Sequence, residues 1–210
     1  RELLLKDIND ILVPSRMEIA DISKVLFDSI TSFLLNDNTQ LGEYRLRVTP
    51  KQEASNEFQI LSATAKKLRD ELKHLSASMK KFARRLNASV PDFEDDNSIY
   101  EVPFTELNSY SGRLDEVTNG LEMMFELETE NRSDYVHFFT SNVRKTGKYT
   151  SYSSLPITIS QQMIDYCFDK IPCTIMVSGT MTTGGNFKFL KNRLGLSNEV
   201  VAENLIEGRY

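Results

Sequence analysis

The chain has 210 residues, of which 40% are hydrophobic and 26% are charged, a composition that excludes disordered, collagen-like and disulfide-scaffold proteins. Its 25 basic and 30 acidic residues give a net charge of −5, which taken alone points away from nucleic-acid binding. No run of 18 apolar residues occurs and no secretion signal is apparent, so we expect a cytoplasmic protein with no membrane partner.

Two helices are predicted before residue 35. A short one has its apolar positions at helical spacing and is expected to end at Pro14. These positions are Leu4, Leu5, Ile8, Ile11 and Leu12. A longer amphipathic helix follows, with apolar residues at Ile19, Ile22, Leu26, Ile30 and Phe33.

A long helix is predicted from Phe58 to Leu86, because apolar residues recur there in alternating steps of three and four. They are Phe58, Leu61, Ala65, Leu68, Leu72, Leu75, Met79, Phe82 and Leu86. Residues 56–87 carry eight basic and three acidic residues, a local net charge of +5. This basic face could be solvated, could pair with an acidic segment, or could contact DNA phosphates. The candidate nucleic-acid-binding residues are Lys66, Lys73, Lys80, Lys81, Arg84 and Arg85.

A second long helix is predicted within a strongly acidic segment. Residues 88–130 contain twelve acids and one base, a net charge of −11. Its expected seam comprises Phe104, Leu107, Tyr110, Leu114, Val117, Leu121 and Met124, with Pro103 near the helix start. We expect the two long helices to pair antiparallel across an exposed tip at residues 87–101. Residues 1–130 are therefore predicted to form an elongated helical bundle.

Beyond residue 130 the pattern predicts a smaller α/β part. Strands are expected at 135–140 and 149–155 with Gly147 in the turn between them, and then a helix at 161–171 capped by Ser160. The apolar run at 173–177 is typical of a strand buried on both faces of a parallel sheet. A helix at 186–194, ended by Gly195, follows. The hydroxyls of Ser178 and Thr180 come directly after the buried strand, where such sheets bind ligands.

The residues that follow this strand resemble a known family. The stretch CTIMVSGTMTTGGNFKFLKNRLGL, residues 173–196, is similar to motif III and the next helix of DinG/XPD-type superfamily 2 DNA helicases. In that family a buried strand leads into Ser-Ala-Thr, Leu-Thr, a glycine and Phe-x-x-[Phe/Leu]-x-x-Arg-Leu-Gly-Leu. Gly179 stands here in place of the usual Ala, and Met181 in place of Leu. Residues 153–160 also resemble the Ala-Pro-Leu-x-Val-Ser approach to the family's second motor domain.

The resemblance implies a role in an ATP-dependent DNA helicase that acts in DNA repair. Residues 1–130 would be the helical Arch insertion, and 131–210 part of a RecA-like parallel sheet. Ser178, Gly179 and Thr180 would be the motif III residues that couple nucleotide state to the grip on DNA. The implied partners are single-stranded or forked DNA and the remaining motor domains of a longer polypeptide. The chain starts at Arg1 rather than at a methionine, and we expect it to be a fragment.

Several chemistries are not expected from the fragment itself. It has no GxxxxGK[ST] loop and no DEAH-like box, so we expect ATP and Mg²⁺ to bind only in the full-length parent and the fragment to hold no catalytic residue. Cys167 and Cys173 are six residues apart, which favours two buried thiols over a metal site. A hydrolase with Ser178 as nucleophile lacks the GxSxG elbow. The rival to the helicase interpretation is a non-enzymatic helical-bundle module that binds other proteins.

Overall fold

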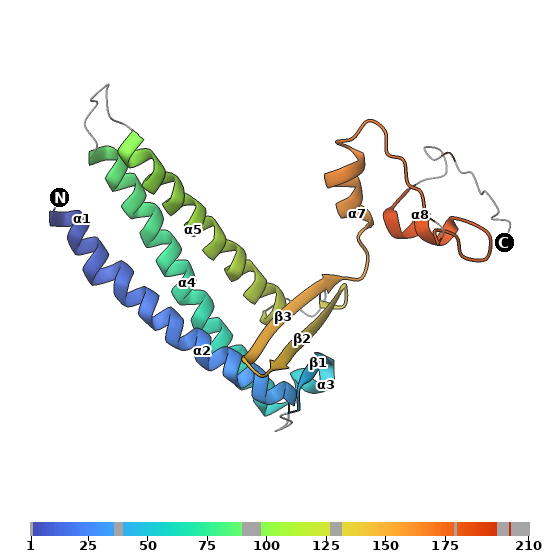
Figure 1. Cartoon of the computed structure of the whole chain (residues 1–210), viewed down its shortest axis with the longest axis horizontal. Helices are drawn as coiled ribbons and strands as arrows, with labels where there is room; N and C mark the ends of the chain where they lie inside the picture. Colours follow the sequence, from blue (N-terminus) through green and yellow to red (C-terminus); the bar gives the residue numbers. More distant parts are fainter. Residues whose placement is uncertain are drawn as a thin grey trace. The chain divides into compact units, whose positions relative to one another are not determined.

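A computed structural model describes residues 2–35, 40–89, 98–126, 132–178, 180–196 and 202. The chain divides into two compact units, Arg1–Leu155 and Pro156–Tyr210. The division falls after Leu155 and not at the expected boundary after residue 130, because the strands that follow residue 134 pack against the helices of the first unit. The fold is mainly helical with a small antiparallel sheet, as Figure 1 shows.

The first helix of unit 1 continues through the proline that was expected to end it. Helix α1 (Glu2–Asp7) leads through a π-helical turn, η1 (Ile8–Leu12), into α2 (Val13–Leu35). The N–H of Val13 donates to the carbonyl of Ile8, a wider turn than in an α-helix. This turn displaces the carbonyls that the Pro14 ring would otherwise meet, so the prediction of a helix end at Pro14 is wrong.

The predicted antiparallel pair of long helices is confirmed. Helices α4 (Asn56–Ser89) and α5 (Ser98–Phe125) lie side by side, and α2 packs on α4 as well (Figure 1). Seven of the nine expected seam residues of α4 are buried, all except Met79 and Leu86. The connector expected at 87–101 falls largely outside the described residues.

The seam predicted for α5 is partly wrong. Tyr110 and Val117 are exposed, whereas Ser111 and Thr118 are buried against α4. A straight α-helix drifts from a seven-residue repeat, so its contact face moves away from the strict seam. The Thr118 hydroxyl donates to its own helix at Leu114 O, 2.8 Å away. Helix α5 also begins at Ser98, so that Pro103 lies inside it rather than at its start.

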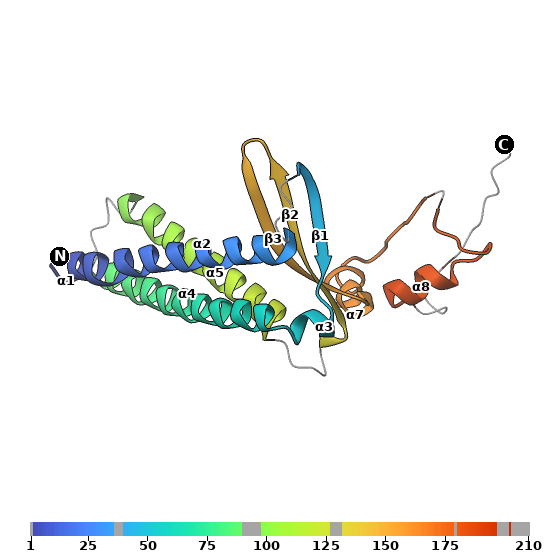
Figure 2. The same ribbon diagram turned by 90° about the horizontal axis from the view of Figure 1, so that it is seen from below.

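A three-stranded sheet, ordered β1-β2-β3, lies at one end of these helices (Figure 2). The predicted hairpin is confirmed as β2 (Tyr135–Arg144) and β3 (Gly147–Pro156). Strand β1 (Gly42–Arg47) was not predicted; it pairs antiparallel with β2 and is followed by the short helix α3 (Pro50–Glu53). The sheet is therefore antiparallel, and the expected partial RecA-like parallel sheet is wrong.

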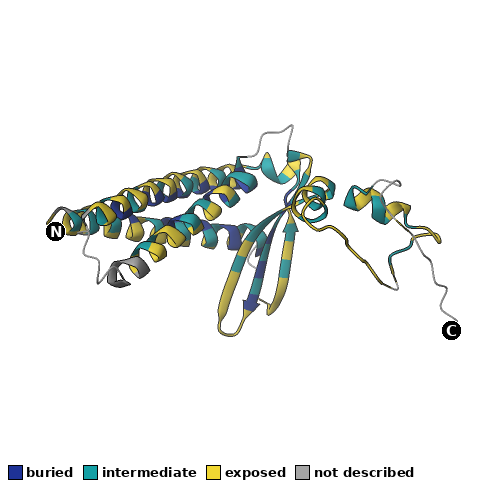
Figure 3. Ribbon diagram, turned by 90° about the horizontal axis from the view of Figure 1, so that it is seen from above, coloured by how far each residue is buried: buried dark blue, intermediate teal, exposed yellow. Residues whose placement is uncertain are grey.

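The core of unit 1 lies where one face of this sheet meets the helices. Alternate residues of β2 are buried, as Figure 3 shows along the sheet. Phe139 is fully buried, with its ring 6.1 Å from that of Phe33 and 6.2 Å from that of Phe125. Leu26, Leu61 and Leu121 complete this cluster from α2, α4 and α5. Burial of such side chains contributes about 2 kcal/mol each.

Unit 2 contains the two predicted helices but not the predicted strand. Helix α7 (Ser160–Met163) continues as a π-helical turn, η2 (Ile164–Phe168), and α8 (Lys188–Leu194) ends at Gly195 with φ +72°. Residues 173–178 form no regular secondary structure, and Ile175 is 84% exposed. A strand needs a hydrogen-bonding neighbour, and no described residue supplies one here. Cys167 is half-buried and Cys173 exposed, so the prediction of buried thiols is wrong.

Candidate nucleic-acid interface

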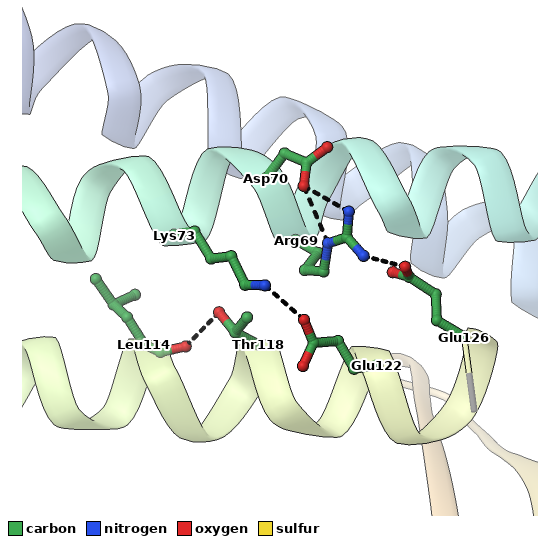
Figure 4. Close-up of polar contacts among 7 residues, drawn as sticks. All are labelled: Arg69, Asp70, Lys73, Leu114, Thr118, Glu122 and Glu126. Atoms are coloured by element: carbon green, nitrogen blue, oxygen red, sulfur yellow. Dashed lines mark hydrogen bonds and ion pairs between the residues drawn. The ribbon is translucent and has the colours of Figure 1, made fainter. Parts of the chain in front are cut away.

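Two of the six candidate cations on α4 are paired with acids of α5. Lys73 Nζ lies 2.6 Å from Glu122 Oε1, and Lys80 Nζ lies 2.6 Å from Asp115 Oδ2. Figure 4 shows the contact of Lys73 with Glu122, which joins the two helices. The alternative in which the basic helix pairs with the acidic segment thus accounts for Lys73 and Lys80. Their positive charge is partly neutralised before any phosphate approaches.

Asp115 is the most highly connected acid of this helix pair. Its carboxylate accepts from Lys80 and, at 2.6 Å, from the buried hydroxyl of Ser76. The Lys80 and Ser76 hydrogen bonds hold the pKa of Asp115 below its usual value. This carboxylate therefore helps to fix the register of α4 against α5.

A further arginine joins α4 to α5 near the sheet. Arg69 donates to Asp70 at 2.7 Å and forms an ion pair with Glu126, the residue that follows α5 (Figure 4). The hydrogen bond to Asp70 is the main cause of the raised pKa of Arg69. Glu126 Oε1 is buried and has no hydrogen-bond partner among the described residues. The ion pair with Arg69 therefore compensates the charge of a partly buried carboxylate and stabilises the contact between the helices.

The remaining candidate cations divide into two groups. Arg85 lies 2.5 Å from Asp7 of α1, which ties the start of the chain to the end of α4. Lys66, Lys81 and Arg84 are exposed, and none forms an ion pair within the described part of the chain. Three of the six predicted residues thus form no ion pair with any described residue.

The predicted motif III residues lie in unit 2 on an exposed stretch of chain. Ser178 Oγ is 3.2 Å from Thr180 Oγ1 and also accepts from the Thr180 backbone N–H at 3.2 Å. The two hydroxyls therefore lie close together at the end of the apolar run. Gly179, the third predicted motif residue, lies outside the described residues.

A second basic and aromatic surface was missed by the sequence predictions. It is the solvent face of the sheet, where Arg45 and Arg47 project from β1 opposite Thr140 and Phe138 of β2. The Arg45 guanidinium lies 4.9 Å from the centroid of the Phe138 ring. The sequence signal that could have predicted β1 is the alternation of charged residues with Tyr44 and Leu46. Alternation of polar and apolar residues with a period of two is typical of a half-buried strand.

A buried polar group supports this sheet from its inner face. His137 is 3% exposed, and its Nδ1 lies 2.7 Å from Ser154 Oγ. Burial, reinforced by the charge of Arg132, lowers the pKa of His137 to about 4. Arg132 is itself held by Glu53 at 2.5 Å. His137 is consequently neutral at physiological pH, and its hydrogen bond to Ser154 joins β2 to β3.

Comparisons with known proteins do not show a family for this chain. No protein-family model matches the chain, and no curated protein is significantly similar to it. Within the described ranges, no cluster of three or more His, Cys, Asp or Glu side chains could hold a metal ion. Nor is any described helix both long and apolar enough to cross a membrane.

Proposed function

We propose that this chain is part of an ATP-dependent DNA helicase of the DinG/XPD type, which translocates on DNA and unwinds it. Unit 1 supplies the helical Arch that faces single-stranded or forked DNA. Unit 2 begins the second motor domain and carries the coupling element Ser178, Gly179 and Thr180. The observation that carries the proposal is the motif at residues 173–196, whose order of apolar run, hydroxyls, glycines and helix follows the family pattern.

The exposure of the apolar run supports this proposal. Ile175 and Val177 are 84% and 89% exposed, and Met176 is 40% exposed. Exposure of consecutive apolar residues to water is unfavourable, and it marks a surface that another element covers. Elements of the remaining motor domains are the proposed cover of this run.

The chemistry of ATP hydrolysis belongs to the other motor domains. This chain has no GxxxxGK[ST] loop to surround the phosphates of ATP, so ATP and Mg²⁺ are proposed to bind to the other motor domains. The fragment alone is therefore expected to be inactive as an ATPase. Its role is to transmit the nucleotide state through Ser178 and Thr180 to the DNA-facing unit.

The test is the double substitution Ser178→Ala/Thr180→Ala in the complete polypeptide that contains this chain. Each lost hydrogen bond is worth about 0.5–1.5 kcal/mol, and the hydroxyls are exposed, so folding should survive. We expect most of the DNA-stimulated ATP hydrolysis to remain and most of the forked-duplex unwinding to be lost. Thr183→Ala is the matched control, since this nearby threonine is also exposed and lies outside the Ser-x-Thr pair.

Two results would contradict the proposal. Equal loss of hydrolysis and unwinding would mean that the hydroxyls serve hydrolysis or stability. No ATP-driven unwinding by the unsubstituted polypeptide would favour the second candidate, a non-enzymatic helical module that binds other proteins. That candidate is favoured by the ion pairs of Lys73 and Lys80, which assign part of the basic face of α4 to internal packing.

A further inference from the structure

Among the described residues of unit 1, none packs on the solvent face of the three-stranded sheet. The inner face packs on the helices through Phe139 of β2 and Tyr152 of β3. Thr31 of α2 reaches Thr150 of β3 at 2.6 Å, which places α2 on the same side (Figure 2). The opposite face is half-buried or exposed along all three strands (Figure 3). It carries Arg45, Arg47, Phe138, Thr140, Arg144, Tyr149, Ser151 and Ser153.

This sheet is strongly basic, although the chain as a whole is acidic. The three strands and the β2–β3 turn contain five cations and one acid, a net charge of +4. The acid, Glu43, forms an exposed contact of 3.5 Å with Arg45, which contributes little. Arg47, Lys145 and Lys148 form no ion pair in the described part of the chain. The charges here are available to a ligand, unlike those of Lys73 and Lys80 on α4.

Aromatic rings lie among these cations. Arg45 covers the Phe138 ring at 4.9 Å, and Arg144 lies 5.7 Å from the centroid of the Tyr149 ring. Tyr149 is 59% exposed. Paired planar groups of this kind present flat surfaces on which unpaired nucleic-acid bases stack, while the guanidinium groups neutralise phosphates.

The two aromatic positions are spaced for separate bases. The contacts His137–Ser154 and Ser141–Thr150 fix the hairpin register, and this register sets Tyr149 beside Asn142, four residues along β2 from Phe138. At about 3.4 Å per residue the two rings are roughly 14 Å apart along the strand. Bases of one strand stack at about 3.4 Å, so each ring would take a base of its own.

We propose that this face of the sheet binds single-stranded nucleic acid: Arg45 leaves the Phe138 ring to contact a phosphate, Phe138 and Tyr149 stack bases, and Arg47 and Arg144 contact further phosphates. The inference deepens the proposed function, on which it rests for the choice of DNA as partner. It moves the principal DNA contact of unit 1 from the basic face of α4 to the sheet. A duplex is a poor ligand here, because its bases are already stacked and paired.

The test measures binding of the 210-residue chain to a labelled dT20 oligonucleotide by fluorescence anisotropy over a range of salt concentrations. Phe138→Leu/Tyr149→Leu keeps apolar bulk but removes both rings, and should weaken binding at least about fivefold. Arg45→Gln/Arg47→Gln should reduce the slope of log K against log salt by about 1.4, since each single-strand phosphate contact contributes about 0.7. Circular dichroism of each variant verifies the fold.

Matched controls exist elsewhere in unit 1. Tyr110 of α5 is 52% exposed and lies 5.7 Å from Arg113, the same arrangement as Tyr149 with Arg144. Tyr110→Leu should change the affinity less than twofold. Arg16→Gln/Lys24→Gln removes two exposed cations of α2 and should leave the salt slope nearly unchanged.

Four outcomes would overturn the inference. They are absence of dT20 binding at low salt, equally tight binding of a 20-base-pair duplex, equally tight binding of poly-glutamate, and loss of affinity on substitution of Lys66 and Arg84 but not of the sheet residues. The last of these leaves the proposed helicase function intact. Conversely, sheet-dependent dT20 binding without ATP-driven unwinding by the complete polypeptide would refute the helicase proposal and retain this one.

Discussion

His137 makes the stability of unit 1 depend on pH. His137 Nδ1 forms a hydrogen bond of 2.7 Å with the Ser154 hydroxyl, which also lies 3.8 Å from Met124 Sδ. Nε2 is buried without a hydrogen-bond partner. Protonation would place a charge in this site beside Arg132, with only Glu53 to offset it. The folded state therefore favours the neutral ring.

The size of the effect follows from the two pKa values. The pKa of His137 falls from 6.5 in the unfolded chain to about 4 in the folded one, and each unit is worth about 1.36 kcal/mol. The unfolded chain binds the extra proton below pH 6.5, so stability falls as the pH drops from about 6.5 to about 4 and then levels off. Between pH 7 and pH 5 the expected loss is about 2 kcal/mol.

The assay is urea unfolding of the chain, followed at 222 nm, at several pH values between 7.5 and 4. His137→Asn serves as the comparison, because an asparagine amide nitrogen can replace Nδ1 toward Ser154 without titrating. Carboxylates such as Asp115 titrate in both proteins. The difference in pH dependence between their free energies of unfolding therefore gives the contribution of His137. Identical pH dependence of the two proteins would refute the argument that burial keeps His137 neutral.

Three further substitutions test the packing. Arg69→Ala leaves the partly buried Glu126 without its cation and should cost about 2 kcal/mol in urea unfolding, a cost that Glu126→Gln in the same chain should reduce. Ser76→Ala removes the 2.6 Å hydrogen bond to Asp115 and should cost about 1 kcal/mol by the same measurement. Gly195→Ala sets a Cβ 2.8 Å from Ser160 Cβ at positive φ, so hydrogen exchange should accelerate in α7 and α8 and stay unchanged in α4.

The long helices could be predicted because their signal is local. A repeat of apolar residues every three or four positions specifies one buried face, whatever the partner is. The exposed Tyr110 and Val117 of α5 mark the limit of this rule. Which face a helix buries at each turn depends on the path of its neighbour, and a single seam does not contain that information.

Strand predictions succeeded or failed according to their hydrogen-bonding partners. The hairpin at 135–156 carries its partner in the adjacent sequence, so its pairing could be anticipated. Strand β1 pairs with β2 across some ninety residues of intervening chain, a contact that no local pattern reveals. The apolar run at 173–177 has strand composition but no partner among the described residues. Composition alone therefore predicted a strand where the structure has none.

The candidate DNA contacts depend in the same way on long-range register. Sequence places Lys80 and Arg85 on a basic helix, but only the packing brings them to Asp115 and Asp7. Replacement of these two residues by glutamate would test whether the basic helix binds DNA. It would also place each new carboxylate beside an existing one and so destabilise the bundle. A loss of DNA binding in such a variant would then report unfolding as readily as a lost phosphate contact. Exposed cations that form no ion pair with a described residue, such as Arg47, separate the two effects, because we expect their removal to leave the bundle intact.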